Sequence, residues 1–193
     1  MNSYLDWLLG EVLGALDDTG LADDTAVFAF ADHGDWAGDY GLVEKWPSAL
    51  DDTETRVPLL ARLPGNAAGH VVREQVELFD IMATTLELAG VEARHTHFAR
   101  SLAPQLQGAP GDPERAVFAE AGYDPHEPHC FEGHGGSGDV KLDPRGIYYP
   151  KALQQQEHRA SVCRATMIRT PTHKLIYRRL EGAVSELYDL VKD

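Results

Sequence analysis

The chain has 193 residues, of which 43% are hydrophobic and 25% are charged, a composition typical of a folded soluble protein with one core. Its 31 acidic residues outnumber the 17 basic ones and give a formal net charge of -14. A field of this sign repels phosphate backbones and anionic lipids, so neither nucleic acid nor a membrane surface is an expected partner, and an anionic substrate needs a local positive centre.

Apolar residues at helical spacing between Leu5 and Leu16 predict an amphipathic helix that ends at Gly20 in a left-handed cap. This stretch has neither the basic start nor the unbroken apolar centre of a signal peptide, and no later run is long enough to span a bilayer. The next segment, "AVFAFA" at 26–31, is an apolar run bounded by turn-forming residues. It predicts a strand buried on both faces of a mainly parallel sheet.

A second strand and a second helix are predicted further along the chain. "VPLLAR" at 57–62 is an apolar run with Pro58 near its start, where a missing N–H donor is tolerated. Asp80 is the predicted N-cap of a helix through "IMATTLELAG" that stops at Gly90. This alternation of helices and strands is typical of α/β proteins.

The pattern changes in the second half of the chain. "AVFAE" at 116–120 predicts another strand, and the Gly, Pro and His content of 121–160, without a clear period, predicts a long loop. "ATMIRT" and "HKLIYR" flank "PT" like the two strands of an antiparallel hairpin, and "SELYDL" follows them. We therefore expect an α/β core over 1–120, then the long loop, and a small antiparallel subdomain over 161–193.

The first predicted strand ends on Asp32, His33 and Gly34. In open α/β sheets, ligands bind beyond the carboxyl ends of the strands. On a straight strand the two side chains would point to opposite faces, but a turn at Gly34 would let carboxylate and imidazole converge on one cation. The alternative is that Asp32 caps a turn and His33 is a hydrogen-bonded buried histidine, because so short a motif is weak by itself. The segment offers two ligands of a divalent metal, not a full set.

Several segments together resemble the sulfatase family of the alkaline phosphatase superfamily. "TGLADDTAVFAFADHGDWAGDYGLVEKW" is similar to the stretch in which a strand delivers an Asp-His metal pair and the following loop supplies a substrate-binding lysine. "TRVPLLARLPG", "VELFDIMATTLELAG", "MIRTPTHKLIYR" and "SELYDL" resemble the strand, the helix and the small carboxyl-terminal subdomain that follow in the same order. The resemblance implies an α/β, alkaline-phosphatase-like sandwich of helices around a mainly parallel sheet, present in part, with a small C-terminal antiparallel subdomain.

Carried over to this sequence, the resemblance makes Asp32 and His33 metal ligands and Lys45 a contact to a sulfate or phosphate oxygen. A divalent cation beside a lysine would supply the positive centre that the net charge requires. Calcium is typical of the family and prefers oxygen ligands, whereas a nitrogen ligand gives manganese some weight. Without the resemblance, Lys45 would be interpreted as a solvated surface lysine.

Other charged residues near this segment have structural interpretations. Arg56 is expected to pair with a nearby acid among residues 51–54 and not to bind an anion. Asp35 and Asp39 lie close enough in the sequence to orient His33, but solvated loop acids are the commoner case. These residues are not assigned to the site.

The resemblance also shows what the sequence lacks. Sulfatases attack the ester sulfur with a formylglycine made from the Cys or Ser of a Cys/Ser-x-Pro-x-Arg motif, which precedes the Asp-His segment. Cys130 is followed by "FEGH" and Cys163 by "RATM", so neither cysteine belongs to that motif. We therefore expect a carboxyl-terminal half of a sulfatase, and whether Met1 is the genuine start stays open. Such a chain has no catalytic residue of its own, binds metal weakly and turns over slowly or not at all.

A histidine-rich segment lies inside the predicted loop, and its candidate ligands are His126, His129, Cys130 and His134. These residue types can bind zinc, but structural zinc sites usually have two separated ligand pairs, and the prolines favour an extended loop. Two alternatives are a loop at the rim of the cleft, whose histidines or Tyr123 help to choose the substrate, and a plain surface loop. The role of His158 is equally open.

The implied function is metal-dependent hydrolysis of a small-molecule sulfate ester. A phosphonate or phosphate ester hydrolase of the same superfamily is the nearest alternative, and a catalytically inactive truncated homologue is the alternative of another class. The sequence slightly favours the cytoplasm as the compartment, and it does not indicate an oligomeric state or the alcohol portion of the substrate.

Overall fold

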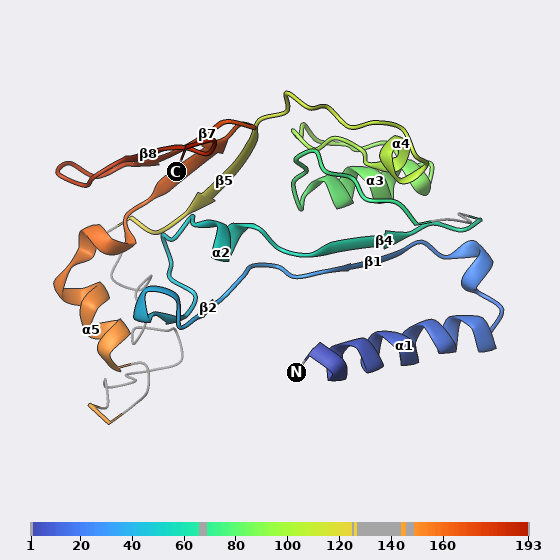
Figure 1. The fold of residues 1–193 in the computed structure, drawn as a ribbon, viewed down its shortest axis with the longest axis horizontal. Helices are drawn as coiled ribbons and strands as arrows, with labels where there is room; N and C mark the ends of the chain where they lie inside the picture. The colour runs from blue at the N-terminus through green and yellow to red at the C-terminus, as the bar shows by residue number, and fades with distance from the viewer. Residues whose placement is uncertain (1, 66–68, 125, 127–143, 146–148, 193) are drawn as a thin grey trace. The chain divides into compact units, whose positions relative to one another are not determined.

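The structure is a computed structural model that describes residues 2–65, 69–124, 126, 144–145 and 149–192 (Figure 1). The chain forms two compact units. The first unit consists of Met1–Ala31, Pro58–Arg73 and Leu78–Gly111, and the second of Asp32–Val57, Glu74–Glu77 and Asp112–Asp193. All three residues of the predicted site lie in the second unit.

Both predicted helices of the first unit are present and end at the predicted glycines. These helices are α1 (Asn2–Asp18) and α3 (Asp80–Leu88), and Gly20 and Gly90 follow them with φ of 71° and 65°. Each glycine N–H donates to the carbonyl three residues earlier, and the next N–H donates to the carbonyl five residues earlier. This is the Schellman arrangement, which satisfies carbonyl groups at the helix end. A short 3-10 helix, η1 (Ala22–Asp24), follows α1.

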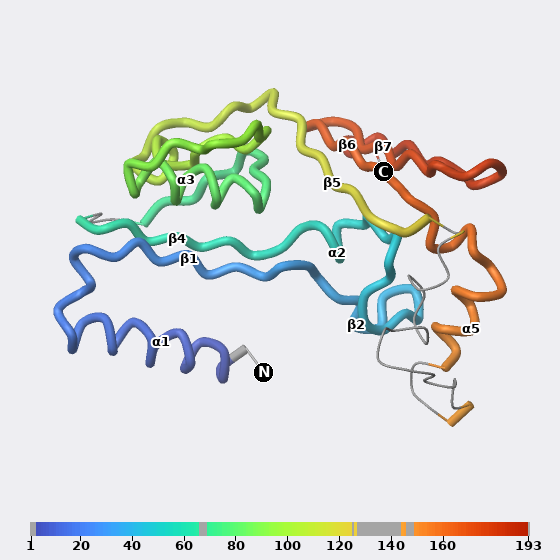
Figure 2. Tube along the Cα trace, turned by 180° about the vertical axis from the view of Figure 1, so that it is seen from behind, coloured from blue at the N-terminus to red at the C-terminus, as the bar shows by residue number. Residues whose placement is uncertain are grey.

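The two predicted strands of the first unit are β1 (Val27–Phe30) and β4 (Leu59–Arg62), which lie side by side (Figures 1 and 2). They pair antiparallel, and the described residues do not show the mainly parallel sheet expected from the sequence. Parallel neighbours need a crossover of about a dozen or more residues, usually helical, and the segment between these strands contains only short elements. Phe30 is 51% exposed, so β1 is not buried on both faces as predicted. The described residues contain no parallel sheet.

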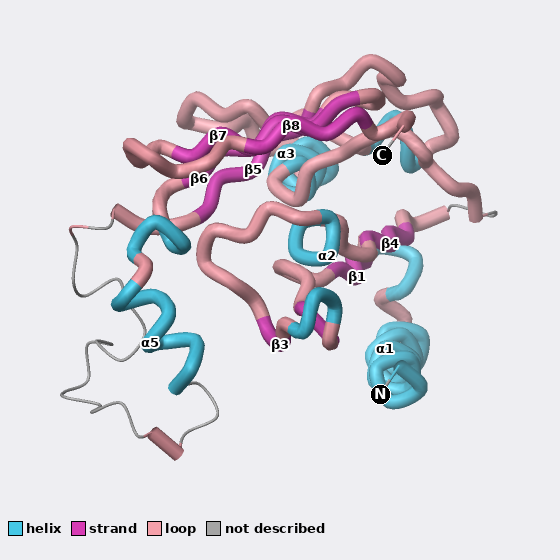
Figure 3. Tube along the Cα trace, turned by 60° about the vertical axis from the view of Figure 1, so that its left-hand side comes forward, coloured by secondary structure: helices cyan, strands magenta, loops and turns pink. Residues whose placement is uncertain are grey.

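Asp80 does not cap α3, which corrects the sequence prediction. Phe79 occupies the N-cap position, and no side chain there caps the helix. Asp80 is fully buried, and its Oδ1 accepts the N–H of Arg100 at 2.8 Å, so the carboxylate serves the segment that leads to α4 (Ala103–Leu106). Within this unit, α1 and α3 lie on opposite sides of the β1–β4 pair (Figures 1 and 3).

The second unit contains a four-stranded antiparallel sheet, which Figure 3 shows in magenta. Its strands, in spatial order, are β5 (Val117–Ala121), β6 (Ala165–Arg169), β7 (His173–Arg178) and β8 (Glu186–Asp189). The predicted hairpin and the strand after it are confirmed. The predicted strand at 116–120 is also present, and it pairs with β6. One face of the sheet packs Ala165, Met167 and Ile176 against Leu50.

Part of the predicted long loop is helical. α5 (Tyr149–Glu157) lies in the range expected to be loop, and the 3-10 helix η4 (Arg159–Val162) begins in that range, so residues 149–157 and 159–160 are helical where a loop was predicted. The sequence "KALQQQE" consists of good helix formers, and Pro150 stands in the first turn, where a missing N–H costs little. In the described part of the chain, no helix combines the length and apolar character needed to cross a bilayer.

A short helix, α2 (Asp52–Thr55), is tied to the sheet through Asp52. Asp52 Oδ1 lies 2.6 Å from Arg169 Nη1 and 3.0 Å from Lys174 Nζ, and the Lys174 side chain is only 5% exposed. The acid thus pairs with cations of the sheet and not with Arg56, which is exposed and has no ion pair with any described residue. Burial raises the pKa of Asp52, but the hydrogen bond and charge of Lys174 and the charge of Arg169 outweigh burial and hold it below its ordinary value.

We predict that Asp52→Ala lowers the free energy of unfolding by about 1–3 kcal/mol at pH 7, because a buried ammonium loses its charged acceptor. Since the folded pKa of Asp52 is depressed, its contribution is present above the unfolded pKa of about 3.9 and is lost as the pH falls through the folded value. Urea unfolding at pH 7 and at pH 3 tests this. Glu181→Ala removes an exposed acid in the same unit and serves as the control. Equal stability of the two variants at pH 7 would contradict the assignment.

Candidate metal and anion site

A short antiparallel hairpin separates the predicted metal ligands from the predicted anion contact. Its strands are β2 (Trp36–Ala37) and β3 (Val43–Glu44), joined through the 3-10 helix η2 (Asp39–Gly41). Trp36 pairs with Glu44. The pairing ends there, and Glu44 has a left-handed φ of 66°, so Asp32 and His33 precede the hairpin and Lys45 follows it. The three predicted residues therefore flank the open end of one hairpin.

Asp32 and His33 lie beside each other with two donor atoms close together. His33 Nδ1 lies 2.8 Å from the carbonyl oxygen of Gly34, which only accepts hydrogen bonds, so Nδ1 is the donor and the neutral ring carries its lone pair on Nε2. That Nε2 lies 3.6 Å from Asp32 Oδ2. The other carboxylate oxygen, Oδ1, accepts the backbone N–H of His33 at 3.0 Å. The Asp32 side chain is 85% exposed and that of His33 37%.

The separation of Asp32 Oδ2 and His33 Nε2 fits two adjacent ligands of one cation. With metal–ligand bonds of about 2.1–2.5 Å meeting near a right angle, the donors lie about 3–3.6 Å apart. A carboxylate oxygen and an imidazole nitrogen suit a divalent ion of the calcium or manganese type. Among the described residues, no group of three or more His, Cys, Asp and Glu side chains could hold a metal ion, so this pair supplies two donors.

Gly34 fixes the turn that follows His33 because no other residue fits its position. A Cβ at residue 34 would lie 1.8 Å from the carbonyl oxygen of Thr53, a backbone atom of α2. The Gly34 N–H donates to the carbonyl of Glu54 at 2.8 Å. The backbone after the predicted ligands is therefore in direct contact with α2.

Glu54 holds both sides of the hairpin entrance. Its carbonyl accepts the Gly34 N–H, and its Oε1 accepts the backbone N–H of Trp46 at 2.9 Å. The residue is only 7% exposed. Burial raises the pKa of the Glu54 carboxyl above its ordinary value, although the Trp46 N–H and the nearby His33 act to lower it. One buried residue thus joins the segment after His33 to the segment after Lys45.

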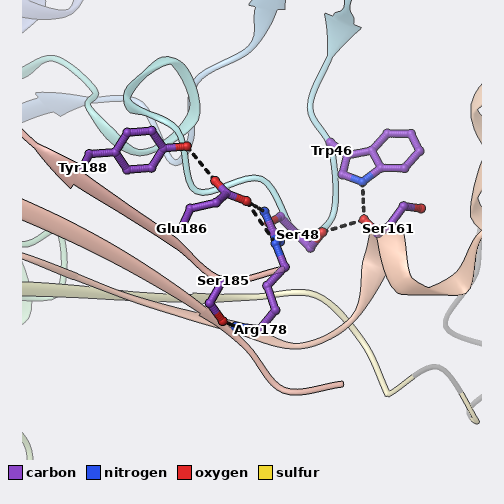
Figure 4. Close-up of polar contacts among 7 residues, drawn as sticks. All are labelled: Trp46, Ser48, Ser161, Arg178, Ser185, Glu186 and Tyr188. Carbon is purple, nitrogen blue, oxygen red and sulfur yellow. Dashed lines mark hydrogen bonds and ion pairs between the residues drawn. The ribbon is translucent and has the colours of Figure 1, made fainter. Parts of the chain in front are cut away.

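Lys45 has an anchored backbone and an exposed side chain. The next residue donates from Trp46 Nε1 to the carbonyl of Ser161 at 2.5 Å, and Ser48 Oγ donates to the same oxygen at 2.6 Å (Figure 4). On the other side, Glu44 binds Lys151 at 2.9 Å. Lys45 itself is exposed and makes no hydrogen bond or ion pair with the part of the chain that the structure describes. An exposed side chain on an anchored backbone is compatible with a solvated surface lysine and with a lysine that contacts an anion.

Comparison with known proteins identifies the family. The family model for sulfatases matches residues 1–91. Arylsulfatase K of Danio rerio is 38% identical over 106 residues, which are 55% of this chain and 20% of that protein. Choline-sulfatase of Rhizobium meliloti (strain 1021) is 35% identical over 128 residues, 64% of this chain and 24% of that protein. The region 1–91 belongs to the sulfatase family.

Solved structures agree with this assignment. The phosphonate monoester hydrolase of Agrobacterium radiobacter matches 100% of this chain and 34% of its own chain, with a TM-score of 0.73 and 26% sequence identity. The fold is thus alkaline-phosphatase-like, consistent with membership of that superfamily. The chain spans about a fifth to a quarter of the length of the curated relatives that it matches.

The sheet of the second unit supports the Lys45 side of the hairpin, which lies in the sulfatase-family region. Arg178 Nη1 donates to the carbonyl of Ser48 at 3.1 Å, and Arg178 Nη2 binds Glu186 Oε1 at 2.8 Å (Figure 4). Tyr188 donates its hydroxyl to Glu186 Oε2 at 2.7 Å, and this bond, together with burial, raises the pKa of Tyr188 to about 12. The segment that follows Lys45 is therefore held by residues from β7 and β8.

Two other sequence hypotheses have structural outcomes. Asp35 and Asp39 are exposed, and the His33 ring is oriented by the Gly34 carbonyl, not by either acid. In the histidine-rich segment, the exposed His126 Nδ1 lies 2.9 Å from Asp124 Oδ1. The remaining candidate ligands, His129, Cys130 and His134, lie outside the described residues. His158 is exposed, and its backbone N–H donates to the carbonyl of Gln154.

The residue that sequence reasoning missed at this site is Glu54. It entered the sequence analysis only as an acid that could pair with Arg56. Its role depends on burial and on two hydrogen bonds to segments 8 and 20 residues away. The only local signal was an acid three residues before a predicted strand, which does not distinguish a buried acceptor from a solvated one.

We predict that Gly34→Ala destabilises the second unit by about 1–3 kcal/mol or more, because the added methyl group overlaps a backbone carbonyl and displaces α2. Gly14→Ala is the matched control, since its Cβ meets nothing within 4 Å and alanine favours a helix by about 0.5–1 kcal/mol. Thermal unfolding compares the two variants with the wild type. A Gly34→Ala chain as stable as Gly14→Ala would show that the close contact is not maintained in solution.

Proposed function

We propose that this chain carries part of the active site of a metal-dependent hydrolase of small-molecule sulfate esters. The observation that carries the proposal is the Asp32–His33 pair, with its donor atoms 3.6 Å apart, in the region that belongs to the sulfatase family. Two of the relatives are named for sulfate ester hydrolysis, arylsulfatase K and choline-sulfatase. The exposed Lys45 at the same open end of the hairpin adds a positive charge.

In this proposal Asp32 Oδ2 and His33 Nε2 hold a divalent cation. Calcium is the preferred ion, because the carboxylate is a hard ligand and the family typically uses calcium, and manganese is the alternative because of the imidazole nitrogen. A bound cation stabilises charge that develops on the transferred group. The chain's own contribution is orientation, since the Gly34 carbonyl fixes the His33 tautomer and the His33 N–H fixes one oxygen of Asp32.

Lys45 is the proposed contact to an oxygen of the sulfate group. The formal net charge of -14 makes a local cation necessary for an anionic substrate. Glu54 binds the backbone on both sides of the hairpin, next to this lysine and next to the metal pair. The side chain of Lys45 needs no rearrangement of the backbone to reach an anion.

The nucleophile is not among the residues that we assign. Neither Cys130 nor Cys163 belongs to a Cys/Ser-x-Pro-x-Arg motif, and Cys163 is fully buried. We therefore expect the 193 residues alone to hydrolyse sulfate esters slowly or not at all. Activity is expected from a polypeptide that combines these residues with a nucleophile segment, which we call the complete enzyme.

A second candidate function is hydrolysis of phosphonate or phosphate esters. The TM-score of 0.73 with a phosphonate monoester hydrolase, over the whole of this chain, favours it. A metal pair and a lysine bind phosphoryl and sulfuryl oxygens by the same electrostatic interactions, so this half of the site does not discriminate between them. Paired substrates must separate the two functions.

We predict that the chain binds Mn²⁺ weakly and that Asp32→Ala and His33→Ala each abolish this binding. Broadening of the Gly34 backbone amide signal by Mn²⁺ in NMR spectra, a signal that both variants retain, gives a readout that does not depend on turnover. In the complete enzyme, each substitution is expected to lower kcat by more than about 100-fold, since even losing a residue that orients a ligand costs about 10–100-fold. Asp39→Ala removes a nearby exposed acid and should change neither quantity. Unchanged Mn²⁺ broadening in both variants would remove the pair from the site.

We predict that Lys45→Ala lowers kcat/KM of the complete enzyme by about 10²–10³-fold, the usual effect of removing one group that stabilises transition-state charge. Lys45→Arg keeps the charge and should recover part of the loss. Both variants are assayed on an aryl sulfate, an aryl phosphate diester and an aryl phosphonate monoester. The wild-type preference assigns the substrate class, and unchanged kcat/KM in Lys45→Ala would leave Lys45 as a surface lysine. A complete enzyme that hydrolyses none of the three substrates would favour an inactive homologue.

A further inference from the structure

A pocket of about 310 Å³ lies at one end of the β5–β8 sheet, within the second unit and separate from the residues assigned above. Its lining comes from the end of β5 and the residues after it (120–123), from the start of β6 (164–166), and from Arg179 directly after β7. The lining includes two guanidinium groups in a chain that is strongly acidic overall. The pocket therefore differs in charge from the rest of the molecule.

A glycine shapes the floor of this pocket. Gly122 has φ of 83°, and a Cβ there would lie 2.2 Å from the carbonyl oxygen of Cys163. The backbone around it is anchored, because Gly122 N–H donates to the carbonyl of Pro47 and Tyr123 N–H donates to that of Val162. No side chain from position 122 fills the hollow, and the main chain that lines it is held on both sides.

The two arginines are cross-strand neighbours. Arg179 N–H donates to the carbonyl of Arg164 at 2.8 Å, which continues the β6–β7 register of Ala165 with Arg178 by one pair. Both side chains are exposed. Like charges directly opposite each other destabilise an antiparallel pair. Asp124 lies close enough to Arg164 to interact with its charge, whereas Arg179 has no ion pair with any described residue.

The other polar groups that line the pocket indicate which chemical groups the rest of a ligand would need. Glu120 pairs with Thr166 across β5 and β6, two residues further into the sheet than Arg164. Its carboxylate repels an oxyanion and accepts a hydrogen bond from a hydroxyl group, and Thr166 both donates and accepts. The pocket volume is at the lower end of the range of about 300–1,000 Å³ found for small-molecule sites. An anionic group at the arginine end and hydroxyl groups at the Glu120 end fit this polarity.

We propose that this pocket binds a hydroxyl-bearing organic oxyanion, with a sulfate or phosphate group between Arg164 and Arg179 and a hydroxyl group on Glu120. Guanidinium groups bind such oxyanions with two parallel hydrogen bonds, which a lysine cannot do. The ligand relieves the repulsion between the two arginines, so part of its binding free energy comes from an unfavourable contact in the free protein. This site does not depend on the proposed hydrolase activity.

The test is calorimetric titration of the chain with inorganic sulfate, inorganic phosphate, glucose 6-sulfate, glucose 6-phosphate and glucose. Saturable binding of the sugar esters is expected, with Arg164→Gln and Arg179→Gln each weakening it at least tenfold. Glu120→Gln is expected to weaken binding of the sugar esters but not binding of the inorganic ions. The ratio of the affinities for the sulfate and the phosphate compounds shows which of the two oxyanions the pocket prefers.

Two control variants separate this site from general charge effects and from the proposed active site. Arg94→Gln removes an exposed arginine of the first unit and should bind the sugar esters as the wild type does, whereas Lys45→Ala measures how much of the binding comes from the proposed active site. Unfolding temperatures of all variants show whether each one is folded. No saturable binding of any probe, or wild-type affinity in both arginine variants, would overturn the proposal. Loss of binding in Lys45→Ala alone would show that the oxyanion binds beside the β2–β3 hairpin and not in this pocket.

Discussion

The second unit depends on a buried acidic residue that accepts two backbone hydrogen bonds. The carbonyl of Glu54 accepts the Gly34 N–H, and its carboxylate accepts the Trp46 N–H. The segments before β2 and after β3 are therefore both bound to this one residue. An ionised group with 7% exposure is costly to bury, and it is retained here with a raised pKa. Glu54 thus contacts the backbone next to the proposed ligands and the backbone next to the proposed anion contact.

The hairpin is also held by residues more than a hundred positions away in the chain. Ser161 accepts hydrogen bonds from both Trp46 and Ser48, and Arg178 joins Ser48 to the sheet. Asp52 is tied to the same sheet through Lys174. The C-terminal sheet of this chain is therefore a support for the segment around residues 46–52, which explains why the two belong to one compact unit.

Local sequence patterns predicted most helices and strands, but they did not predict which residues far apart in the sequence contact one another. The residues of β7 are those of the predicted strand "HKLIYR", and both helices end at the predicted glycines, because apolar runs and glycine stops are local signals. The antiparallel pairing of β1 with β4 was not predicted, since strand length and apolarity do not specify a neighbour. Asp80 and Asp52 bind partners that lie 20 and more than a hundred residues away in the chain, which no local pattern indicates. The helix α5 was not predicted because the segment around it is rich in glycine, proline and histidine.

The orientation of His33 affects the thermodynamics of metal uptake. Because its Nδ1 is already hydrogen-bonded to the Gly34 carbonyl, the ring has little rotational freedom left to lose when an ion arrives. The neutral form presents a lone pair at the correct nitrogen, so no tautomer has to be exchanged first. A pair of donors prepared in this way contributes more of its intrinsic affinity than two freely rotating side chains would, which matters most for a site with few ligands.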